Sequence, residues 1–510
     1  MYNRGFTPEM ITTLEANEIF VFGSNLMGHH YGGAANMAYT RFGAEWGCGE
    51  GLTGQSYAIP TMHGGAKDIK PYVDDFIDYA SDHPEMLFYV TKIGCGIAGL
   101  NVNDIAPLFV RAMPISNVIL PKEFVAVIEA LLGHEHHGGR NLSPQASTLK
   151  VEVKDLYKDK IRGSLMAGAA GDALGYAVEF SSHSAIRARY GVSGITKFAL
   201  DASGKALISD DTQMTLFTAN GLLNVDRLGA VPLRAITYAY IDWYYTQVAT
   251  KEDRRSTCWL SDISGLYALR APGNTCLSAL RAISMGYPAE NNSKGCGGIM
   301  RVAPIALYGA VSGRMTIDEV ANIAGGAAYI THHHPLGYLS AALFATFLYK
   351  VVPLTPAEVK ATSRALLLEC LDVIDRGYEN ALKREREYLR ELTIRVLGLV
   401  DLQTGDAKAI GALGEGWVGE EAWAIALYSA LRHIDSVEQA IITAVNHDGD
   451  SDSTGSICGN IMGAIYGYDH IKERNIFCPK GCSLEDCLEL SKVILTMADD
   501  LYNGPYDSSR

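Results

Sequence analysis

Two patterns of hydrophobic and polar residues divide the chain. Up to about residue 133, short apolar runs end in polar or glycine-rich turns: EIFVFGSN at 18–25, MLFYVTKIGCGIAGL at 86–100 and NVILP at 117–121. Such runs indicate strands, whereas EFVAVIEALLG at 123–133 has the spacing of a helix. Strands that alternate with helices predict an α/β domain over residues 1–133.

A polar segment follows this first domain. GHEHHGGRNLSPQASTLK is rich in Gly, His and Ser, which is typical of a connection between domains. We therefore predict an interdomain linker over residues 134–154. His134, His136 and His137 could bind a metal ion, but a solvated linker is the simpler interpretation of them.

From about residue 155 the apolar positions recur with the period of a helix. Long stretches of this kind lie at 159–180, 327–352, 356–400 and 420–434, and strand patterns are scarce. The sequence therefore predicts an almost entirely helical domain over residues 155–510.

The overall composition of the chain mainly argues against certain classes of protein. A chain of 510 residues is too long for one ordinary core, so two domains or more are expected. The net charge of −14 disfavours a nucleic-acid partner, which would need a broad basic surface, but it leaves one open. The N-terminus has no apolar core of signal-peptide length, and no run of about 18 apolar residues suggests a membrane span. We predict a soluble cytoplasmic protein without a membrane partner.

The ten cysteines are scattered, without a C-x-x-C pair. Cys478, Cys482 and Cys487 cluster loosely, but no second ligand group lies nearby at the spacing of a zinc site. Reduced structural thiols are the better interpretation.

Three acidic groups stand in otherwise small and apolar stretches of the helical half. They are Asp172 with Glu179, Ser209-Asp210-Asp211, and Asp450-Ser451-Asp452-Ser453. The last two share a hydroxyl beside carboxylates at the start of an apolar helical run. One polar side chain is enough to cap a helix, so capping alone leaves the second carboxylate unexplained. Buried carboxylates need a partner, and two such clusters that met could hold two hard cations and activate water.

The segment NHDGDSDSTGSICGN at 446–460 allows other interpretations. Counted from Asp448 as a calcium-binding loop, the sixth position is Ser453 instead of glycine and the twelfth is Gly459 instead of glutamate, so that pattern fails. Apolar flanks disfavour a surface turn, although a capping cluster stays open. Glycine recurs every four residues from Gly455, which lets another backbone approach that face. We predict a buried helix with carboxylates at its N-terminal end.

Seven stretches of the helical half carry a resemblance to a known family. In order they are GSLMAGAAGDALGYAVEF, SDDTQMTL, GNTCLSAL, KGCGGIMRVAPIALY, ITHHHPLGYLSA, EGWVGEEAWAIALY and NHDGDSDSTGSICGNIMGAIYG, within about residues 160–470. This half resembles the ADP-ribosylglycohydrolases of the dinitrogenase-reductase-activating glycohydrolase type. The resemblance implies an all-α fold around a binuclear centre of two Mg²⁺ or Mn²⁺ ions.

The family's metal ligands can be carried over residue by residue. The positions that match are Ser209, Asp210, Asp211, Asp450, Asp452 and Ser453. Both hydroxyl positions are serine where threonine is frequent in the family, and serine can still ligate. The acidic residue of the first motif falls on Glu179. Asp448 replaces a glycine that is frequent in the family. Contact with a metal-bound water or the substrate and an exposed position are both open for it, and we leave it outside the ligand set.

The chemistry implied is hydrolysis of the bond between ADP-ribose and a modified side chain, with ADP-ribosyl-arginine as the first expectation. The metals would hold ribose hydroxyls and a water, and Glu179, Asp211 or Asp450 would orient that water or take its proton. The backbone of the loop Gly295–Met300 (GCGGIM), which includes Gly297 and Gly298, would approach the distal ribose or the diphosphate, and a tight turn is the alternative. His332 would contact ADP-ribose, and a core histidine is the alternative.

Gly416 and Trp417 are further candidates for the lining of this pocket. The alternative for Trp417 is a place in the hydrophobic core. The sequence does not decide between the two.

Two glycine-rich loops follow strands of the first domain, in EIFVFGSNLMGHHYGGAANMAY and TKIGCGIAGL, and could cradle a diphosphate. Residues 17–125 resemble macrodomains, the ADP-ribose-binding modules. The resemblance implies that Asn25 lies near the distal ribose. The glycines expected around the phosphates are Gly32, Gly33 and those of the loop Gly94 to Gly99, which are Gly94, Gly96 and Gly99. A Rossmann-like domain for another nucleotide, or for none, is the alternative.

Both halves would then handle ADP-ribose, and the first could recruit modified proteins or cleave a second linkage. One alternative is a binding protein that recognises ADP-ribose without cleaving it, which the intact acidic motifs disfavour. The other is a hydrolase of a small ADP-ribosyl metabolite or of an ADP-ribosylated nucleic acid.

Overall fold

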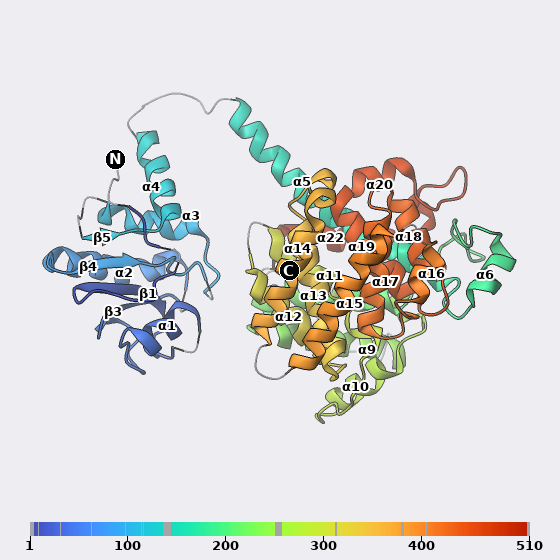
Figure 1. Cartoon of the computed structure of the whole chain (residues 1–510), viewed down its shortest axis with the longest axis horizontal. Coiled ribbons are helices and arrows are strands. Elements are labelled where there is room, and N and C mark those ends of the chain that lie inside the picture. Colours follow the sequence, from blue (N-terminus) through green and yellow to red (C-terminus); the bar gives the residue numbers. More distant parts are fainter. Residues whose placement is uncertain are drawn as a thin grey trace. The chain divides into compact units, whose positions relative to one another are not determined.

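The computed structural model describes residues 5–135 and 144–506, except positions 9, 31, 63, 97, 114, 116, 250–257, 312–313, 379–381 and 403–404. The chain forms two compact units, Met1–Gln145 and Ala146–Arg510 (Figure 1). Of the predicted linker, residues up to Glu135 and from Pro144 onward are helical. His136 and His137 lie outside the described residues.

The first unit contains a five-stranded sheet of order β2-β3-β1-β4-β5. Its strands are β1 (Glu18–Ser24), β2 (Gly51–Thr53), β3 (Ser56–Pro60), β4 (Leu87–Val90) and β5 (Val118–Ile119). Strand β1 pairs in parallel with β3 and β4, β4 pairs in parallel with β5, and only β2 runs antiparallel to its neighbour β3. The central strand and both its neighbours therefore end at the same edge of the sheet, where α/β proteins bind ligands.

Helices cover both faces of this sheet. They are α1 (Gly33–Arg41), α2 (Ala66–Asp82), α3 (Val102–Ile105), η1 (Ala106–Ala112) and α4 (Lys122–Glu135). Successive side chains of β1 enter different cores, because side chains alternate along a strand. Val21 lies in the core with Phe76 of α2, and Phe20 in the core with Ala38 of α1. The predicted α/β character of this unit is confirmed.

In the described part of the second unit, all regular elements are helices apart from two isolated β-bridges, as the sequence predicts. Its α-helices are α5 (Pro144–Tyr176), α6 (His183–Tyr190), α7 (Asp210–Leu223), α8 (Val225–Leu228), α9 (Pro232–Val248), α10 (Asn274–Ser284), α11 (Ala303–Ala310), α12 (Ile317–Tyr329), α13 (Pro335–Val351), α14 (Pro356–Gly377), α15 (Lys383–Asp401), α16 (Asp406–Gly411), α17 (Gly419–Arg432), α18 (Val437–Val445), α19 (Ser451–Tyr466), α20 (Tyr468–Arg474), α21 (Leu484–Cys487) and α22 (Ser491–Asn503). Single 3₁₀ turns form η3 (Trp259–Asp262), η4 (Ser264–Tyr267) and η5 (Cys296–Gly298).

Two of the predicted helical stretches are each divided into two helices. The stretch 327–352 breaks between α12 and α13, where Pro335 occupies the first turn of α13 and the His334 ring accepts a hydrogen bond from the amide of Leu336. Proline is well suited to a first turn because its missing N–H has no partner there anyway. The stretch 356–400 breaks after α14 ends at Gly377.

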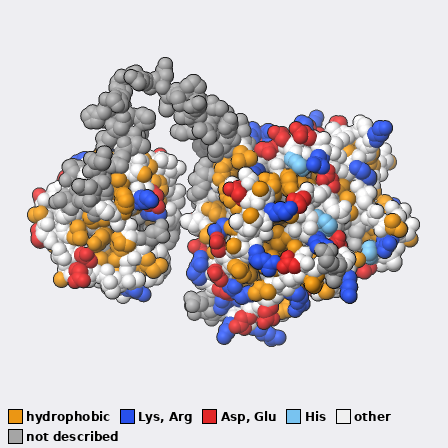
Figure 2. Space-filling model, turned by 45° about the horizontal axis from the view of Figure 1, so that its top comes forward, with side chains coloured by type: hydrophobic (Ala, Val, Ile, Leu, Met, Phe, Trp, Pro, Cys, Tyr) orange, Lys and Arg blue, Asp and Glu red, His pale blue; other side chains and the backbone are white. Residues whose placement is uncertain are grey.

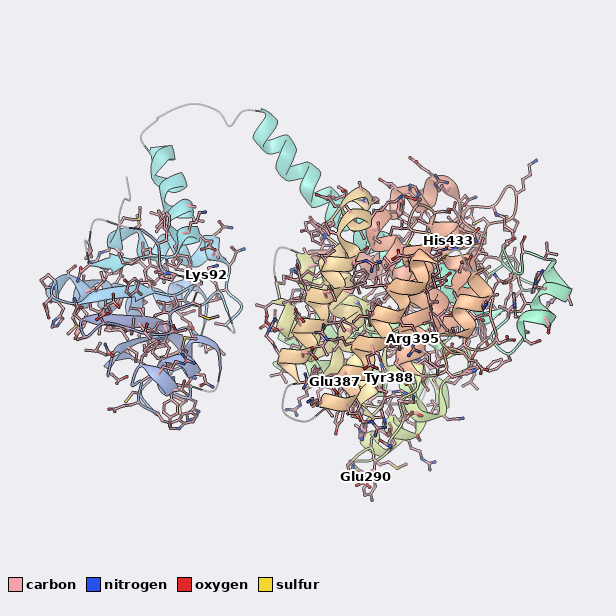
Figure 3. The ribbon with its side chains drawn as sticks, viewed as in Figure 1. Lys92, Glu290, Glu387, Tyr388, Arg395 and His433 are labelled. Carbon is pink, nitrogen blue, oxygen red and sulfur yellow. The ribbon has the colours of Figure 1, made fainter. Side chains whose placement is uncertain are left out.

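Helix α15 shows how the surface helices of this unit are built. Leu389 and Val396 are fully buried, whereas Glu387, Tyr388 and Arg395 are exposed on its outer turns (Figure 3). This is the pattern of an amphipathic helix that packs with one face. On the face of the second unit seen in Figure 2, acidic and basic side chains are interspersed. None of the described helices is long and apolar enough to cross a membrane.

Helices α5 and α19 pack backbone to backbone, which confirms the close approach predicted for the glycine face. A Cβ atom added to Gly459 would lie 2.1 Å from the carbonyl oxygen of Ala167, and one added to Gly463 would lie 2.1 Å from that of Gly163. Gly455 faces the Gly171 carbonyl in the same way, at 2.5 Å. The contact is possible only without side chains on this face.

We expect Gly459→Ala to lower the free energy of unfolding by about 3 kcal/mol, because two rigid backbones must separate to admit the methyl group. Urea unfolding measures this. The matched control is Gly398→Ala in α15, where the position is exposed and an added Cβ meets no atom within 4 Å. That substitution should stabilise by about 0.5 kcal/mol or more, since alanine favours helix. Equal effects at the two positions would contradict the close-packing interpretation.

Candidate functional site

The starts of α7 and α19 lie on one cavity of about 430 Å³ in the second unit. Five carboxylates line it, together with Ser453: Glu179, Asp210, Asp211, Asp450 and Asp452. The two acidic clusters that are far apart in the sequence therefore meet. Of the six predicted metal ligands, five line the cavity, and Ser209 lies behind its wall, fully buried.

The start of α7 is fixed by Asp172 of α5. The Asp172 carboxylate accepts hydrogen bonds from the backbone amides of Ser209 at 2.9 Å and Thr212 at 3.1 Å, and from the Thr212 hydroxyl. The Ser209 hydroxyl in turn accepts from the amide of Asp211 at 3.2 Å. Asp172 is not part of the cavity lining, so its task is to hold the two aspartates that follow Ser209 in place.

The start of α19 has its own cap. The Asp450 carboxylate accepts from the amide of Ser453 at 3.2 Å, and the Asp450 amide donates to the Glu415 carbonyl at 2.8 Å. The Asp452 carboxylate accepts from the same Ser453 amide at 3.0 Å. The predicted capping cluster is therefore present at the start of α19. Capping, however, occupies only one oxygen of each carboxylate.

Two carboxylate oxygens of the cavity have no hydrogen-bond donor among the described residues. Among the described residues, neither Oδ2 of Asp211 nor Oε2 of Glu179 has a hydrogen-bond donor, although both side chains are more than nine-tenths buried. Burial and the nearby Asp452 raise the pKa values of Asp210, Asp211 and Asp450 well above their ordinary range. The same causes raise the pKa of Glu179 to about 10.

A divalent cation would relieve this repulsion, and oxygen donors suit hard cations. Within the described part of the chain, no three His, Cys, Asp or Glu side chains already converge tightly enough to form a closed metal site. The donor set therefore suits a hard cation only by the chemistry of its oxygens, two of which lack a hydrogen-bond donor among the described residues.

The raised pKa values predict how the protein responds to pH without metal. A carboxyl group whose pKa is higher in the folded than in the unfolded chain stabilises the fold less as pH rises above its ordinary value of about 4. In EDTA, Asp210→Asn should therefore stabilise the protein, by about 1–2 kcal/mol at pH 8 and by little at pH 4. Thermal unfolding of both proteins across this range measures the difference. A gain that is independent of pH would contradict the assignment.

Some of the remaining residues predicted for this site line the cavity and others do not. Gly297 and His332 line the cavity. Gly298 does not, because it packs against Ala328 and the Gly337 carbonyl. Burial, followed by the charge of Arg301, lowers the pKa of His332 to about 3, so this ring is neutral and acts only through hydrogen bonds.

Trp417 belongs to the cavity mouth. Its side chain is 39% exposed and stacks on that of Phe180, with 6.1 Å between ring centroids. Phe180 is 75% exposed and also lines the cavity. The alternative core position for Trp417 is therefore wrong. Asp448 is exposed in a neighbouring cavity, where it accepts a hydrogen bond from the amide of His183 at 2.8 Å.

Other lining residues were not singled out from the sequence. They are Phe180, Ala271, Pro272, Gly273, Asn274, Thr275 and Cys276, whereas Gly295, Cys296 and Met300 also line the cavity and belong to the loop predicted to approach the substrate. The motif GNTCLSAL was the only signal for Asn274 to Cys276, and nothing in it marked those side chains. The amide of Gly273 donates to the Asp210 carboxylate at 3.2 Å, which ties this loop to the acidic cluster.

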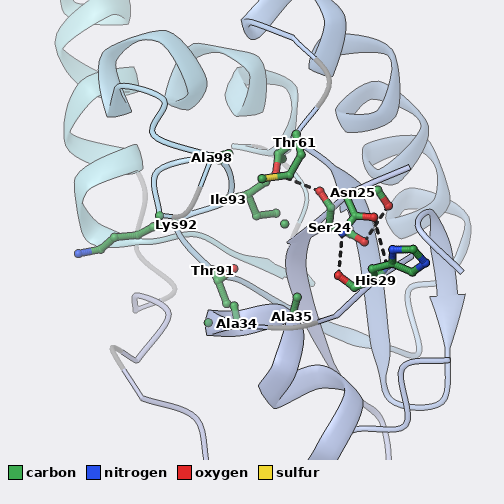
Figure 4. Close-up of a pocket in the computed structure, with 16 residues that line it drawn as sticks. Ser24, Asn25, His29, Ala34, Ala35, Thr61, Thr91, Lys92, Ile93 and Ala98 are labelled. Carbon is green, nitrogen blue, oxygen red and sulfur yellow. Dashed lines mark hydrogen bonds between the residues drawn. The ribbon is translucent and has the colours of Figure 1, made fainter. Parts of the chain in front are cut away.

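The first unit has a pocket of about 320 Å³ at the carboxyl edge of its sheet (Figure 4). Of the residues predicted there, Asn25, Gly32, Gly33, Gly94 and Gly96 line it, and Gly99 does not. Helix α1 begins at this pocket, and its N-cap Gly32 makes no side-chain capping bond. Backbone amides at a helix start of this kind can bind an anion.

The Asn25 side chain holds the loop that borders this pocket. Its Oδ1 accepts from the amides of Met27 and His29, both at 3.1 Å, and its Nδ2 donates to the His29 carbonyl at 2.7 Å. Lys92 points away from the other labelled side chains in Figure 4 and pairs with Glu123 at 2.5 Å. A ligand here would meet mainly backbone groups and small side chains.

Comparison with known proteins identifies the family of the helical unit. A family model described as ADP-ribosylglycohydrolase matches residues 153–509, so the chain belongs to the ADP-ribosylglycohydrolase family, a class of glycosylhydrolases. ADP-ribosylhydrolase ARH1 of Dictyostelium discoideum is 26% identical over 383 residues, covering 62% of this chain and 89% of that protein.

Two further matches cover other shares of this chain and of the matched protein. Human ADP-ribosylhydrolase ARH3 is 25% identical over 217 residues, which is 36% of this chain, so the chain spans about half (54%) of that protein's length. A solved structure named ADP-ribosylglycohydrolase-related protein complex has a TM-score of 0.43 and 20% identity, covering 68% of this chain and 99% of that one.

Proposed function

We propose that the protein is a metal-dependent hydrolase that removes ADP-ribose from modified protein side chains, and that its preferred substrate is ADP-ribosyl-arginine. The observation that carries this proposal is the convergence of five buried carboxylates on one cavity, two of them with unpartnered oxygens. Family membership supplies the reaction class, and the cavity supplies groups that can perform it.

Two Mg²⁺ or Mn²⁺ ions would be held by Asp210, Asp211, Asp450, Asp452 and Ser453, with Ser209 positioning Asp211. When bound, these ions supply Lewis acidity toward the ribose hydroxyls and the attacking water.

Side chains of the cavity would supply the other groups that the reaction needs. Glu179 has one unpartnered oxygen on the cavity. With cations bound, their charge would lower the pKa of Glu179, and its carboxylate would then orient the water and take its proton as the C1″–N bond breaks. Acidic neighbours tolerate the positive charge that develops on the sugar carbon. His332 is neutral and offers a hydrogen bond without charge.

The pocket of the first unit serves as the second ADP-ribose site. Two glycine loops and the open start of α1 surround it, and backbone amides can bind a diphosphate without a basic side chain. A macrodomain-like module of this kind would hold modified proteins near the hydrolase or cleave another linkage.

Release of ADP-ribose from an arginine-ADP-ribosylated protein tests the function, measured with Mg²⁺, with Mn²⁺ and with EDTA. We expect release that depends on the metal. Release that persists in EDTA would move the chemistry to the first unit. If the arginine-linked substrate is inert and serine-linked or small ADP-ribosyl substrates are cleaved, the acceptor is wrong and the reaction class stands. If none is cleaved, the protein is a binder of ADP-ribose.

A further inference from the structure

Arg301 is a buried cation that the proposed chemistry does not use. Its side chain is 0% exposed, and its guanidinium carbon lies 4.2 Å from the centre of the Tyr240 ring. Within the described part of the chain, its hydrogen bonds go to a carbonyl, a hydroxyl and two sulfur atoms, and none goes to a carboxylate. Burying a charge without a counter-charge is costly, so this side chain calls for a functional explanation.

The Thr331 hydroxyl links this charge to His332. Nη2 of Arg301 donates to Thr331 Oγ1 at 2.6 Å, and because arginine has no acceptor atom, the hydroxyl keeps its own proton to donate. Nδ1 of His332 lies 2.9 Å from the same oxygen, whereas the Ala328 carbonyl lies 3.5 Å away, beyond the usual range of an O–H···O bond. The proton of the hydroxyl therefore points to Nδ1, which accepts it.

The Arg301 side chain is itself held in place, so the direction of these bonds is fixed. Its Nη2 also donates to the Ala327 carbonyl of α12 at 3.0 Å. The Tyr240 ring beneath the guanidinium shares a hydrogen bond of 2.8 Å with the Thr218 hydroxyl. Burial, followed by the charge of Arg301, lowers the pKa of His332 to about 3, which keeps the ring neutral. A neutral imidazole whose Nδ1 accepts carries its hydrogen on Nε2.

The Nε2 edge of the His332 ring is turned toward the carboxylate cavity. The ring lines this cavity together with Gly295 and Gly297. A Cβ atom added to Gly295 would lie 3.2 Å from Nε2, and one added to Gly297 would lie 3.4 Å from it. No described residue forms a hydrogen bond with Nε2. The two glycines therefore leave this N–H uncovered on the side of the cavity.

We propose that Arg301 and Thr331 are positioning residues that hold His332 as its Nε2–H tautomer, so that this N–H donates to a substrate oxygen that bears no hydrogen. Phosphate and sugar-ring oxygens are of this kind. With the opposite tautomer, Nε2 would be an acceptor and would face such an oxygen without a hydrogen between them. This inference rests on the proposed function and adds to it the direction of one substrate contact.

Nitrogen-15 NMR of the histidine rings in the full chain tests the tautomer without substrate, because ring nitrogens with and without hydrogen resonate far apart. The signals of His332 are those that His332→Gln removes. Wild type should show Nδ1 without hydrogen and Nε2 with it. Thr331→Val keeps the shape of the side chain but removes the hydroxyl, and should move hydrogen to Nδ1. Thr331→Ser should restore the wild-type signals.

The matched control is Thr346→Val in α13. It removes another fully buried hydroxyl of the second unit, which donates to the Ala342 carbonyl at 2.6 Å, and it should leave the His332 signals in place. Hydrogen on Nδ1 in wild type, or an unchanged tautomer in Thr331→Val, would overturn the positioning role. The wild-type signals decide the tautomer even if Thr331→Val does not fold.

ADP-ribose added with Mg²⁺ tests the substrate contact and should shift the Nε2 signal of wild type. ADP, which lacks the second ribose, shows whether the acceptor belongs to the diphosphate. In release assays, Thr331→Val should raise KM about fivefold and keep kcat within about twofold, as expected for the loss of one binding hydrogen bond. An Nε2 signal that ADP-ribose leaves unchanged would overturn the contact. Failure to release ADP-ribose from protein, with that shift present, would overturn only the proposed function.

Discussion

The Asp452→Ala substitution is expected to lower metal-dependent release of ADP-ribose by about 10³-fold or more. Asp452 is buried, lines the cavity and is the neighbour that most raises the pKa values of Asp210, Asp211 and Asp450 apart from burial itself. A side chain that interacts with all three is central to any shared cation. A bound metal stabilises the transition state by several kcal/mol, and about 4 kcal/mol corresponds to about 10³-fold in rate.

A matched control stands four residues earlier. Asp448 is exposed in the neighbouring cavity and caps α6 through the amide of His183. Asp448→Ala should keep turnover within about threefold of wild type, as expected for a surface change. Initial rates at saturating Mg²⁺ compare the two variants, and circular dichroism checks that both are folded. Similar losses in both would mean that the acidic segment acts through stability or general charge.

The second large effect concerns the first unit. In the full chain, Gly96→Val should weaken the binding of ADP-ribose to the pocket of the first unit by about 10- to 100-fold. Gly96 lines the pocket, has no positive φ, and an added Cβ would meet no described atom within 4 Å. Valine therefore fits the backbone and fills space that a ligand needs, a clash that costs about 1–3 kcal/mol.

Isothermal titration with ADP-ribose in EDTA measures this binding, because chelation removes the contribution of the hydrolase cavity. Gly65→Val is the control: its added Cβ also meets no atom within 4 Å, but Gly65 does not line the pocket. The variant at Gly65 should bind like wild type. Unchanged binding in Gly96→Val would place the ligand elsewhere, and no binding in wild type would reject an ADP-ribose site in this unit.

The local features of the hydrolase cavity could be predicted from the sequence. Ser209 and Asp450 cap the helices that the apolar runs predicted, because capping depends on a few neighbouring residues. Helix α2 was equally accessible and was not assigned, although Ile69, Val73 and Phe76 give it a buried face at helical spacing. The short strand β3 was harder, since five residues buried on both faces carry no alternation.

Which residues face the cavity was beyond the sequence. Ser209 and Gly298 belong to matching motifs, yet the structure turns both away from the cavity, while their neighbours Asp210 and Gly297 line it. A motif does not say which of two adjacent residues faces a ligand when the segment is a helix start or a 3₁₀ turn. The stacking of Phe180 on Trp417 joins residues far apart in the chain, so no local pattern could indicate it.

The glycine face between α5 and α19 has a consequence for genetics. Every missense change of a single base in a glycine codon adds a side chain, so we expect no such change at Gly455, Gly459 or Gly463 to be neutral. Helix α5 carries Asp172, and α19 begins beside Asp450, so displacing one helix disturbs both acidic clusters. A screen that scores only loss of activity would rank these glycines with the aspartates, and only a parallel measurement of protein abundance would tell scaffold from chemistry.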